Sequence, residues 1–200
     1  DWALDLDQLE AAVTPKTKLV AVCNPNNPTG RTLTEAEMEA VVAAAERVGA
    51  WILADEVYGG AERTTDEQTP TFFGRSERVI AIGSMSKAYG LPGLRVGWAV
   101  ADPGLVADIW TRHEYTTISA SMLSNHLAAL ALSPQVRPQL LERTRSFIRR
   151  GYPILERWMA QRPGLLAARP PDAAAIAFCR YDAPVDSLEV VEAIRTRERT

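Results

Sequence analysis

The sequence predicts an α/β fold with a mostly parallel sheet flanked by helices, followed by the start of a smaller α+β domain. Short apolar runs alternate with a helical pattern in the first half of the chain, an order typical of parallel sheets. Three of these runs end in polar clusters, where parallel sheets bind ligands. After about residue 103 the pattern becomes mainly helical. The 200 residues are 46% hydrophobic and 24% charged, as in an ordinary globular chain.

Four apolar runs predict the strands of the sheet, at 18–23, 51–54, 78–83 and 96–100. A helix lies between the first two, because Thr34 and Glu37 form a capping box ahead of apolar residues at helical spacing. Gly49 ends this helix. The strand–helix–strand order requires a crossover connection, which makes the joined strands parallel.

The second half predicts helices at 105–112 and 122–132 and a long amphipathic helix from Val136 to Met159, kinked at Pro153. A linker-like stretch, a short strand at 175–179 and a helix from about Ser187 follow. We expect three parts: the central and C-terminal part of a large domain, the interdomain helices, and the beginning of a small C-terminal domain. Their ranges are 1–120, 121–162 and 163–200.

Composition and chain ends narrow the class of protein. The chain starts with Asp1 and Trp2 and stops within a helical pattern, so we expect a fragment of a longer protein. No apolar stretch approaches about 18 residues, which disfavours a membrane span. The net charge of −3 and the lack of a basic patch disfavour nucleic acid. Two cysteines cannot build a disulfide framework and favour the cytoplasm. No metal site is expected, since the two histidines lack ligand spacing.

Lys87 is one of only three lysines and follows a turn of small residues after a predicted strand. Ser84, Ser86 and Arg95 lie in the same segment and offer the hydroxyl and guanidinium donors that a phosphate ester needs. The alternative is a serine-rich cap beside an arginine that pairs with a surface carboxylate. The Ser84–Lys87 spacing also fits penicillin-recognising enzymes, but the Ser-Asp-Asn and Lys-Thr-Gly segments that they require are missing.

Two other predicted strands end in polar residues. Asp55 ends a strand that is predicted to be buried, where a carboxylate is costly unless it meets a positive partner or hydrogen-bond donors. Tyr58 follows three residues later. Asn27 precedes Pro28 in a turn. Asp55 and Asn27 each have a purely structural alternative, since Asp caps turns and Asn-Pro-Thr-Gly is a common turn sequence.

Four segments together resemble the class I/II aminotransferases, which are fold-type I pyridoxal-phosphate-dependent enzymes. They are Asn-Pro-Asn-Asn-Pro-Thr-Gly at 24–30, Asp-Glu-Val-Tyr at 55–58, Ser-Met-Ser-Lys at 84–87 and Gly-Leu-Arg-Val-Gly at 93–97. The resemblance runs through nearly the whole chain and is strongest over residues 1–132. It implies the large domain of a fold-type I enzyme, a homodimer, and a turn in which Pro28 follows a cis peptide bond.

The resemblance also implies a cofactor, pyridoxal 5'-phosphate, and a role for each matching residue. Lys87 would hold the cofactor as a Schiff base and then move a proton at the substrate α-carbon. Asp55 would pair with the pyridine nitrogen, and Asn27 and Tyr58 would bond the phenolic oxygen. Ser84 and Arg95 would bind the phosphate. The implied cofactor-binding set is Asn27, Asp55, Tyr58, Ser84, Ser86, Lys87 and Arg95.

The implied reaction is amino-group transfer between an amino acid and a 2-oxo acid. A protonated pyridinium absorbs the electrons left at the α-carbon, and a fixed anion such as Asp55 keeps it protonated. Tyr115 and Thr116, in the polar stretch at 113–117, are candidates for substrate recognition, with an ordinary polar loop as the alternative. Elimination, replacement or oxidation of an amino acid such as arginine stays open, as does a non-catalytic regulatory domain of the same fold.

Overall fold

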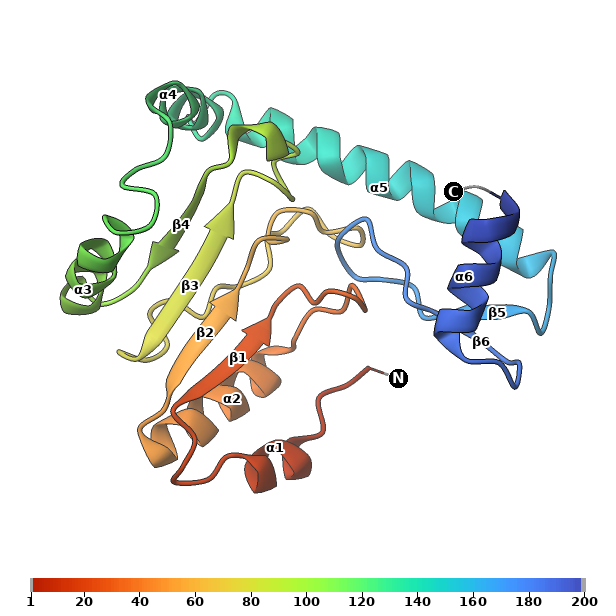
Figure 1. Cartoon of the computed structure of the whole chain (residues 1–200), viewed down its shortest axis with the longest axis horizontal. Helices are drawn as coiled ribbons and strands as arrows, with labels where there is room; N and C mark the ends of the chain where they lie inside the picture. The colour runs from red at the N-terminus through yellow and green to blue at the C-terminus, as the bar shows by residue number, and fades with distance from the viewer. Residues whose placement is uncertain (1, 199–200) are drawn as a thin grey trace.

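The computed structural model describes residues 2–198 and contains the predicted sheet (Figure 1). Within the described residues its four strands follow chain order: β1 (Leu19–Cys23), β2 (Trp51–Asp55), β3 (Val79–Ser84) and β4 (Gly97–Val100). β1, β2 and β3 are parallel, whereas β4 pairs with β3 in the antiparallel sense. The connection from β3 to β4 contains only the 3₁₀ helix η1 (Pro92–Leu94) and no crossover helix. The chain therefore turns back beside β3 and runs in the opposite direction.

The main core lies between the sheet and α2 (Glu35–Val48), with α1 (Leu6–Ala12) beside it on the same face (Figure 1). The predicted capping box is present at the start of α2, and Gly49 ends the helix in the left-handed conformation at φ 68°. Ile52 and Ala54 of β2 are buried in this core. Because side chains alternate along a strand, Asp55 points to the opposite face.

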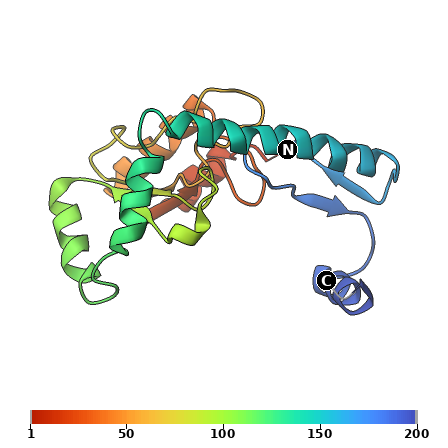
Figure 2. The ribbon, with the colours of Figure 1, turned by 90° about the horizontal axis from the view of Figure 1, so that it is seen from above.

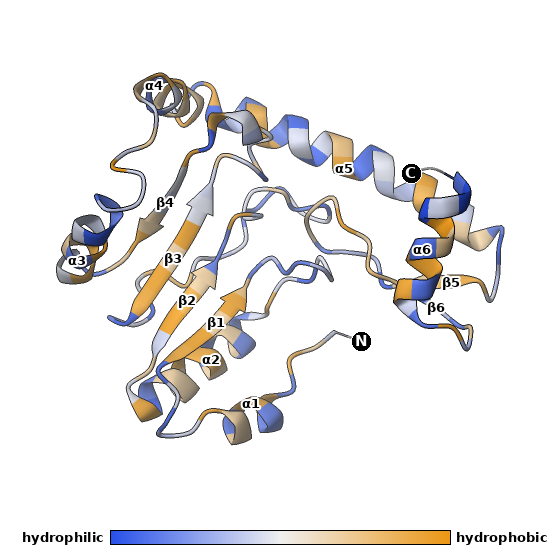
Figure 3. Ribbon diagram, viewed as in Figure 1, coloured by the Kyte–Doolittle hydropathy of each residue, from blue (hydrophilic) through white to orange (hydrophobic). Residues whose placement is uncertain are grey.

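A second core lies beneath the long helix α5 (Arg137–Ala160), which runs along one side of the molecule (Figure 1). Leu141 and Ile148 of α5 pack with Met85 and Ala88 from the turn after β3. α5 continues through Pro153 as one helix. Hydrophobic and hydrophilic residues alternate along it, whereas the strands are mainly hydrophobic (Figure 3). Among residues 2–198, no helix combines the length and apolarity that a membrane crossing requires.

Two shorter helices precede α5: α3 (Pro103–His113) and α4 (Met122–Ala131). Both lie close to the predicted ranges. Large apolar side chains on them and on the loop between them are exposed, among them Trp110, Ile118, Met122 and Leu123. This part of the chain therefore buries little of its own apolar surface.

The C-terminal part differs from the prediction. β5 (Leu166–Ala168) lies in the stretch predicted to be a linker and pairs with β6 (Cys179–Tyr181), so the strand predicted at 175–179 was placed too early. The reason is tertiary, because residues 172–174 instead bond to the first domain: the amides of Asp172 and Ala173 donate to Gly30, and that of Ala174 donates to Ala61. β5, β6 and α6 (Ser187–Glu198) lie at the far end of α5 from α4 (Figure 2).

Candidate active site

The polar residues that follow the parallel strands meet at one edge of the sheet. Cys23, the last residue of β1, is the register partner of Asp55, the last residue of β2. Asp55 is in turn the partner of Ile82, two residues before the end of β3 at Ser84. The three turns that carry Asn27, Tyr58 and Lys87 therefore start side by side.

The turn at 24–30 contains three asparagines that differ in their hydrogen-bond partners. Asn24 is buried and its side-chain oxygen accepts from the Leu33 amide at 2.9 Å. The Asn26 side chain accepts from the Thr29 hydroxyl at 2.7 Å. Asn27 is exposed and keeps its side chain available for a ligand. The peptide bonds before Pro25 and Pro28 are both cis, which confirms the expectation for Pro28.

The turn at 55–58 holds two neighbouring carboxylates in different environments. Glu56 accepts from the Phe72 amide and the Thr71 hydroxyl, each at 2.7 Å. Burial raises the pKa of Glu56, against these hydrogen bonds. The Asp55 carboxylate accepts only from the Val57 amide, at 3.2 Å, among the described residues. Of the two side chains, Asp55 is therefore the carboxylate with an oxygen available to a ligand.

Lys87 lies beside the turn that carries Tyr58. The amide of Ala88 donates to the Val57 carbonyl at 3.3 Å and joins the two turns. The Lys87 Nζ atom is 5.7 Å from the centroid of the Tyr58 ring. The Lys87 side chain is exposed and lines a cavity of about 690 Å³ together with α5 and residues 174–177. Within residues 2–198, its amine forms no ion pair.

Ser84, Ser86 and Arg95 line a different cavity, of about 740 Å³, which reaches Trp110 and His113 on α3. The Ser86 amide donates to the Ser84 hydroxyl at 3.0 Å, and the Met85 amide donates to Val96 at 3.0 Å, so the two segments are held together. Arg95 is exposed, with φ 52°, and donates to the Pro92 carbonyl at 3.0 Å. The structure thus gathers these three residues, and Lys87 directly follows Ser86 in the same turn.

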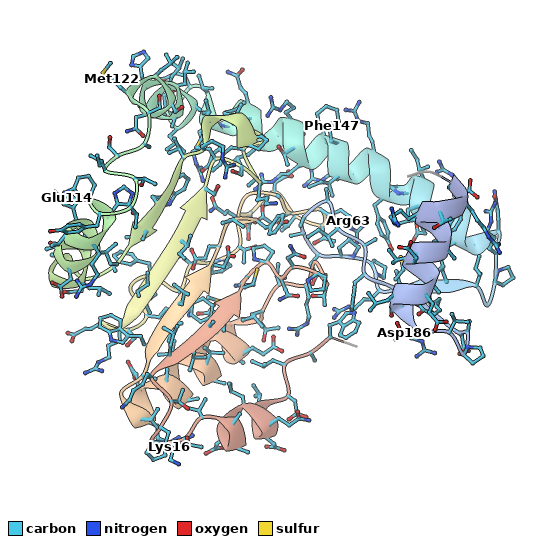
Figure 4. The ribbon with its side chains drawn as sticks, in the orientation of Figure 1. Lys16, Arg63, Glu114, Met122, Phe147 and Asp186 are labelled. Atoms are coloured by element: carbon cyan, nitrogen blue, oxygen red, sulfur yellow. The ribbon has the colours of Figure 1, made fainter. Side chains whose placement is uncertain are left out.

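Tyr115 and Thr116 lie in the loop after α3. Tyr115 is 90% exposed, and the Thr116 hydroxyl donates to the His113 carbonyl at 2.9 Å. The neighbouring Glu114, labelled in Figure 4, lies on the α3 side of the molecule. The role of Tyr115 and Thr116 in substrate recognition stays a prediction.

Sequence reasoning missed a buried ion pair next to the candidate site. Glu62 is 1% exposed and accepts from Arg145 of α5 at 2.8 Å. Arg145 is one of six arginines on α5, and Glu62 follows two glycines at the start of a polar loop. A charged residue on the apolar stripe of an amphipathic helix was the one available signal, since Arg145 lies between the core positions Leu141 and Ile148.

An open, mostly parallel sheet with a lysine, a carboxylate and hydroxyl groups after its parallel strands defines a class of α/β protein that binds small molecules at the sheet edge. Residues 1–186 match the family described as aminotransferase class I and II, and the chain belongs to this family.

Individual relatives agree with this assignment. An aromatic amino acid aminotransferase of Rhodococcus erythropolis is 37% identical over 78% of this chain and 45% of its own length. A capreomycidine synthase of Streptomyces vinaceus is 32% identical over 98% of this chain and 50% of its own. The crystal structure of a PLP-dependent aminotransferase from Streptococcus suis superposes with a TM-score of 0.88 at 30% identity and covers 98% of this chain. The chain spans about half the length of these relatives.

Proposed function

We propose that this protein is a pyridoxal-phosphate-dependent aminotransferase that moves an amino group between an amino acid and a 2-oxo acid. The observation that carries the proposal is the position of the Lys87 amine, 5.7 Å from the Tyr58 ring centroid, at the sheet edge where Asp55 ends β2. Membership of the aminotransferase family supports it.

The donor set at this edge fits the cofactor. The Lys87 amine can react with the cofactor's aldehyde, and the available Asp55 carboxylate can pair with a protonated ring nitrogen. Asn27 and Tyr58 are neutral hydrogen-bond donors for the phenolic oxygen of the cofactor. Ser84, Ser86 and Arg95 line one cavity and supply hydroxyls and a guanidinium for its phosphate. When bound, the cofactor supplies an electron sink for the electrons left at the substrate α-carbon.

The residues of the chain then have distinct tasks. The Lys87 amine would hold the cofactor through its aldehyde group and, when free, would move the proton at the substrate α-carbon. The Asp55 carboxylate would favour the cationic form of the ring nitrogen, because opposite charges attract. Glu56 is held by Phe72 and Thr71, so it does not compete with Asp55 for this task.

The likeness to a capreomycidine synthase over 98% of this chain favours a second candidate. The protein would use the same lysine and carboxylate but complete a reaction other than amino transfer, such as elimination, replacement or oxidation of an amino acid. The likeness to an aromatic amino acid aminotransferase favours amino transfer and an aromatic substrate. Tyr115 and Thr116 are the proposed substrate-recognition residues.

The assembly is also part of the proposal. We propose a cytoplasmic homodimer in which the exposed apolar side chains at 106–130 are covered by the second copy. Their exposure supports this, because a lone protein seldom leaves so many large apolar groups in water. The division into 1–120, 121–162 and 163–200 is supported by the separate small sheet of β5 and β6 at the end of α5.

The test is an absorbance spectrum of the full-length protein with pyridoxal phosphate, followed by a screen of amino donors and oxo-acid acceptors. We expect a visible band that Lys87→Ala abolishes, with Lys16→Ala as the control that keeps it. Unchanged covalent attachment in Lys87→Ala would overturn the proposal. If donors change the band but no acceptor is turned over, the second candidate replaces amino transfer.

A further inference from the structure

A buried carboxylate ties together three segments that surround Lys87. Glu62 accepts from the amides of Gly60 and Thr69, each at 2.8 Å, from the Thr69 hydroxyl at 3.0 Å, and from Arg145 at 2.8 Å. Burial of the Glu62 carboxylate acts to raise its pKa, but these hydrogen bonds outweigh burial and hold the pKa below its usual value. Glu62 is therefore an anion that is almost fully satisfied by donors inside the protein.

The first segment is the turn that carries Tyr58. The Gly60 amide bonds to Glu62, and the next amide, of Ala61, donates to the Tyr58 carbonyl at 2.9 Å. Gly60 has φ 104°, and a Cβ there would lie 2.8 Å from Leu141 of α5, so the turn packs directly on the helix. A shift of Glu62 would thus move the backbone that positions Tyr58.

The second segment is α5. Arg145 is buried, and its charge is compensated by Glu62, which accepts from its terminal nitrogen at 2.8 Å. The Nε atom of Arg145 has no hydrogen-bond partner among the described residues. One turn further along, Arg149 donates to the Arg63 carbonyl at 3.0 Å, and the Arg63 guanidinium lies 4.6 Å from the Tyr152 ring centroid. Arg63, labelled in Figure 4, marks where this loop passes beneath α5.

The third segment is the chain at 172–174. Glu62 and Ala173 form an isolated antiparallel bridge, and the Ala174 amide donates to the Ala61 carbonyl at 2.9 Å. Ala174 lines the same cavity as Lys87. Hydrogen bonds of Glu62 and its neighbours thus connect residues 172–174, helix α5 and the turn that carries Tyr58.

We propose that the Glu62–Arg145 pair is a positioning device that sets Tyr58 relative to Lys87, beyond any contribution to stability. The role of Tyr58 in this proposal rests on the proposed function. The set of hydrogen bonds that joins Glu62 to Gly60, Thr69 and Arg145, here called the clamp, is a property of the polypeptide alone. Two apolar residues could fill the space of a buried ion pair without loss of stability. They could not supply the carboxylate oxygen that holds the Gly60 and Thr69 amides.

The experiment compares two double variants that differ only at position 62. The first, Glu62→Met with Arg145→Met, removes both charges and the acceptor, and is called the Met/Met variant. The second, Glu62→Gln with Arg145→Met, removes both charges but keeps an acceptor oxygen, and is called the Gln/Met variant. Asp66→Asn is the control, because it breaks the exposed ion pair with Arg149 on the same helix. The charged residues of the neighbouring turns, Asp55, Glu56 and Lys87, are unchanged in all variants.

The first measurement is hydrogen exchange of the Ala61 amide, without cofactor. We expect exchange at least about tenfold faster in the Met/Met variant than in the Gln/Met variant, at similar melting temperatures, with the control unchanged. Equal protection of Ala61 in the two double variants would overturn the proposal. If Met/Met does not fold, Arg145→Lys is compared with the wild type, since it keeps the charge but loses the planar guanidinium. Wild-type protection of Ala61 there would equally overturn it.

The second measurement is the pH midpoint of the absorbance change of protein-bound pyridoxal phosphate. Tyr58→Phe removes a donor to the phenolic oxygen, so it should raise this midpoint. The Met/Met variant should raise the midpoint as well. Adding Tyr58→Phe to the Met/Met variant should change the midpoint little further, because both changes act through Tyr58. A midpoint unchanged in Met/Met contradicts the positioning role. If the wild type forms no band, the proposed function fails, while hydrogen exchange still decides whether the clamp exists.

Discussion

Cys23 and Asp55 end neighbouring parallel strands as direct register partners, so a thiol and a carboxylate lie side by side at the candidate site. Burial raises the pKa of the Cys23 thiol, the backbone amide of Asn27 opposes this, and the charge of Asp55 raises the pKa further. This relationship makes Cys23 a reporter of the Asp55 charge that works without any cofactor.

Asp55→Asn should therefore lower the pKa of Cys23 and speed its alkylation at neutral pH, by about two- to fivefold, because the thiolate is the reacting form. The measurement is the rate of iodoacetamide labelling at each cysteine, by mass spectrometry. Cys179 in the same protein is the control. A rate ratio of Cys23 to Cys179 that does not change would contradict the charge coupling.

Glu37 should make stability depend on acid pH. Burial acts to raise its pKa, but hydrogen bonds from Arg31, Thr34 and Leu4 lower it to about 2 from 4.5. A lowered folded-state pKa stabilises the fold above the unfolded value, and this contribution disappears as the pH falls from about 4.5 to 2. Glu37→Gln keeps the capping residue type but should cost up to about 3 kcal/mol at pH 7.

Urea unfolding of the wild type and Glu37→Gln at pH 7, 4 and 2.5 would check this, with the difference shrinking as the pH falls. Glu35→Gln is the control, since Glu35 is an exposed partner of Arg75 and such pairs contribute little. A Glu37→Gln difference that stays constant over this range would show that charge is not its cause.

Gly30 should tolerate no side chain. Its φ is 67°, and a Cβ there would lie 2.4 Å from the Cβ of Pro171 and 2.8 Å from the Ala173 carbonyl. Gly30→Ala should lower the free energy of unfolding by more than about 1 kcal/mol and expose residues 171–177 to proteases. Gly74→Ala is the matched control, because Gly74 also has a positive φ but no neighbouring atom within 4 Å. Equal losses in the two variants would mean that the contact with Pro171 does not matter.

Arg95→Gln should weaken binding of pyridoxal phosphate by about 10- to 100-fold, since a charge-assisted hydrogen bond contributes about 1.5–3 kcal/mol. Binding of pyridoxal, which lacks the phosphate, should change little. Titration of both compounds by absorbance in the wild type and the variant gives the comparison. An equal loss for the two ligands would assign Arg95 a role in holding the loop instead.

Much of the fold follows from local patterns. The strands and α2 were predicted because short apolar runs, a capping box and a terminal glycine act within a few residues of each other. The antiparallel direction of β4 was not predicted, since it depends on how the chain at 85–96 folds back and not on the strand's own residues. The strand at 175–179 was placed too early because backbone partners at Gly30 and Ala61, far away in sequence, hold residues 172–174.

The candidate site divides in the same way. From the order of residues alone, Asn27, Asp55 and Lys87 could be assigned to turns after neighbouring strands, because parallel strands bring their carboxyl ends to one edge. Which asparagine of the turn is exposed, and which of Asp55 and Glu56 keeps an oxygen for a ligand, depended on partners at Leu33, Thr71 and Phe72.

The sequence by itself determined the α/β class and the chemical groups at the sheet edge, since both follow from periodicity and from neighbours along the chain. Only the tertiary structure joined Glu62 to Arg145, 83 residues apart, and packed the pair against the turn that carries Tyr58. No local pattern specifies such a pairing, because the energy of a buried charge depends on every group that surrounds it in space.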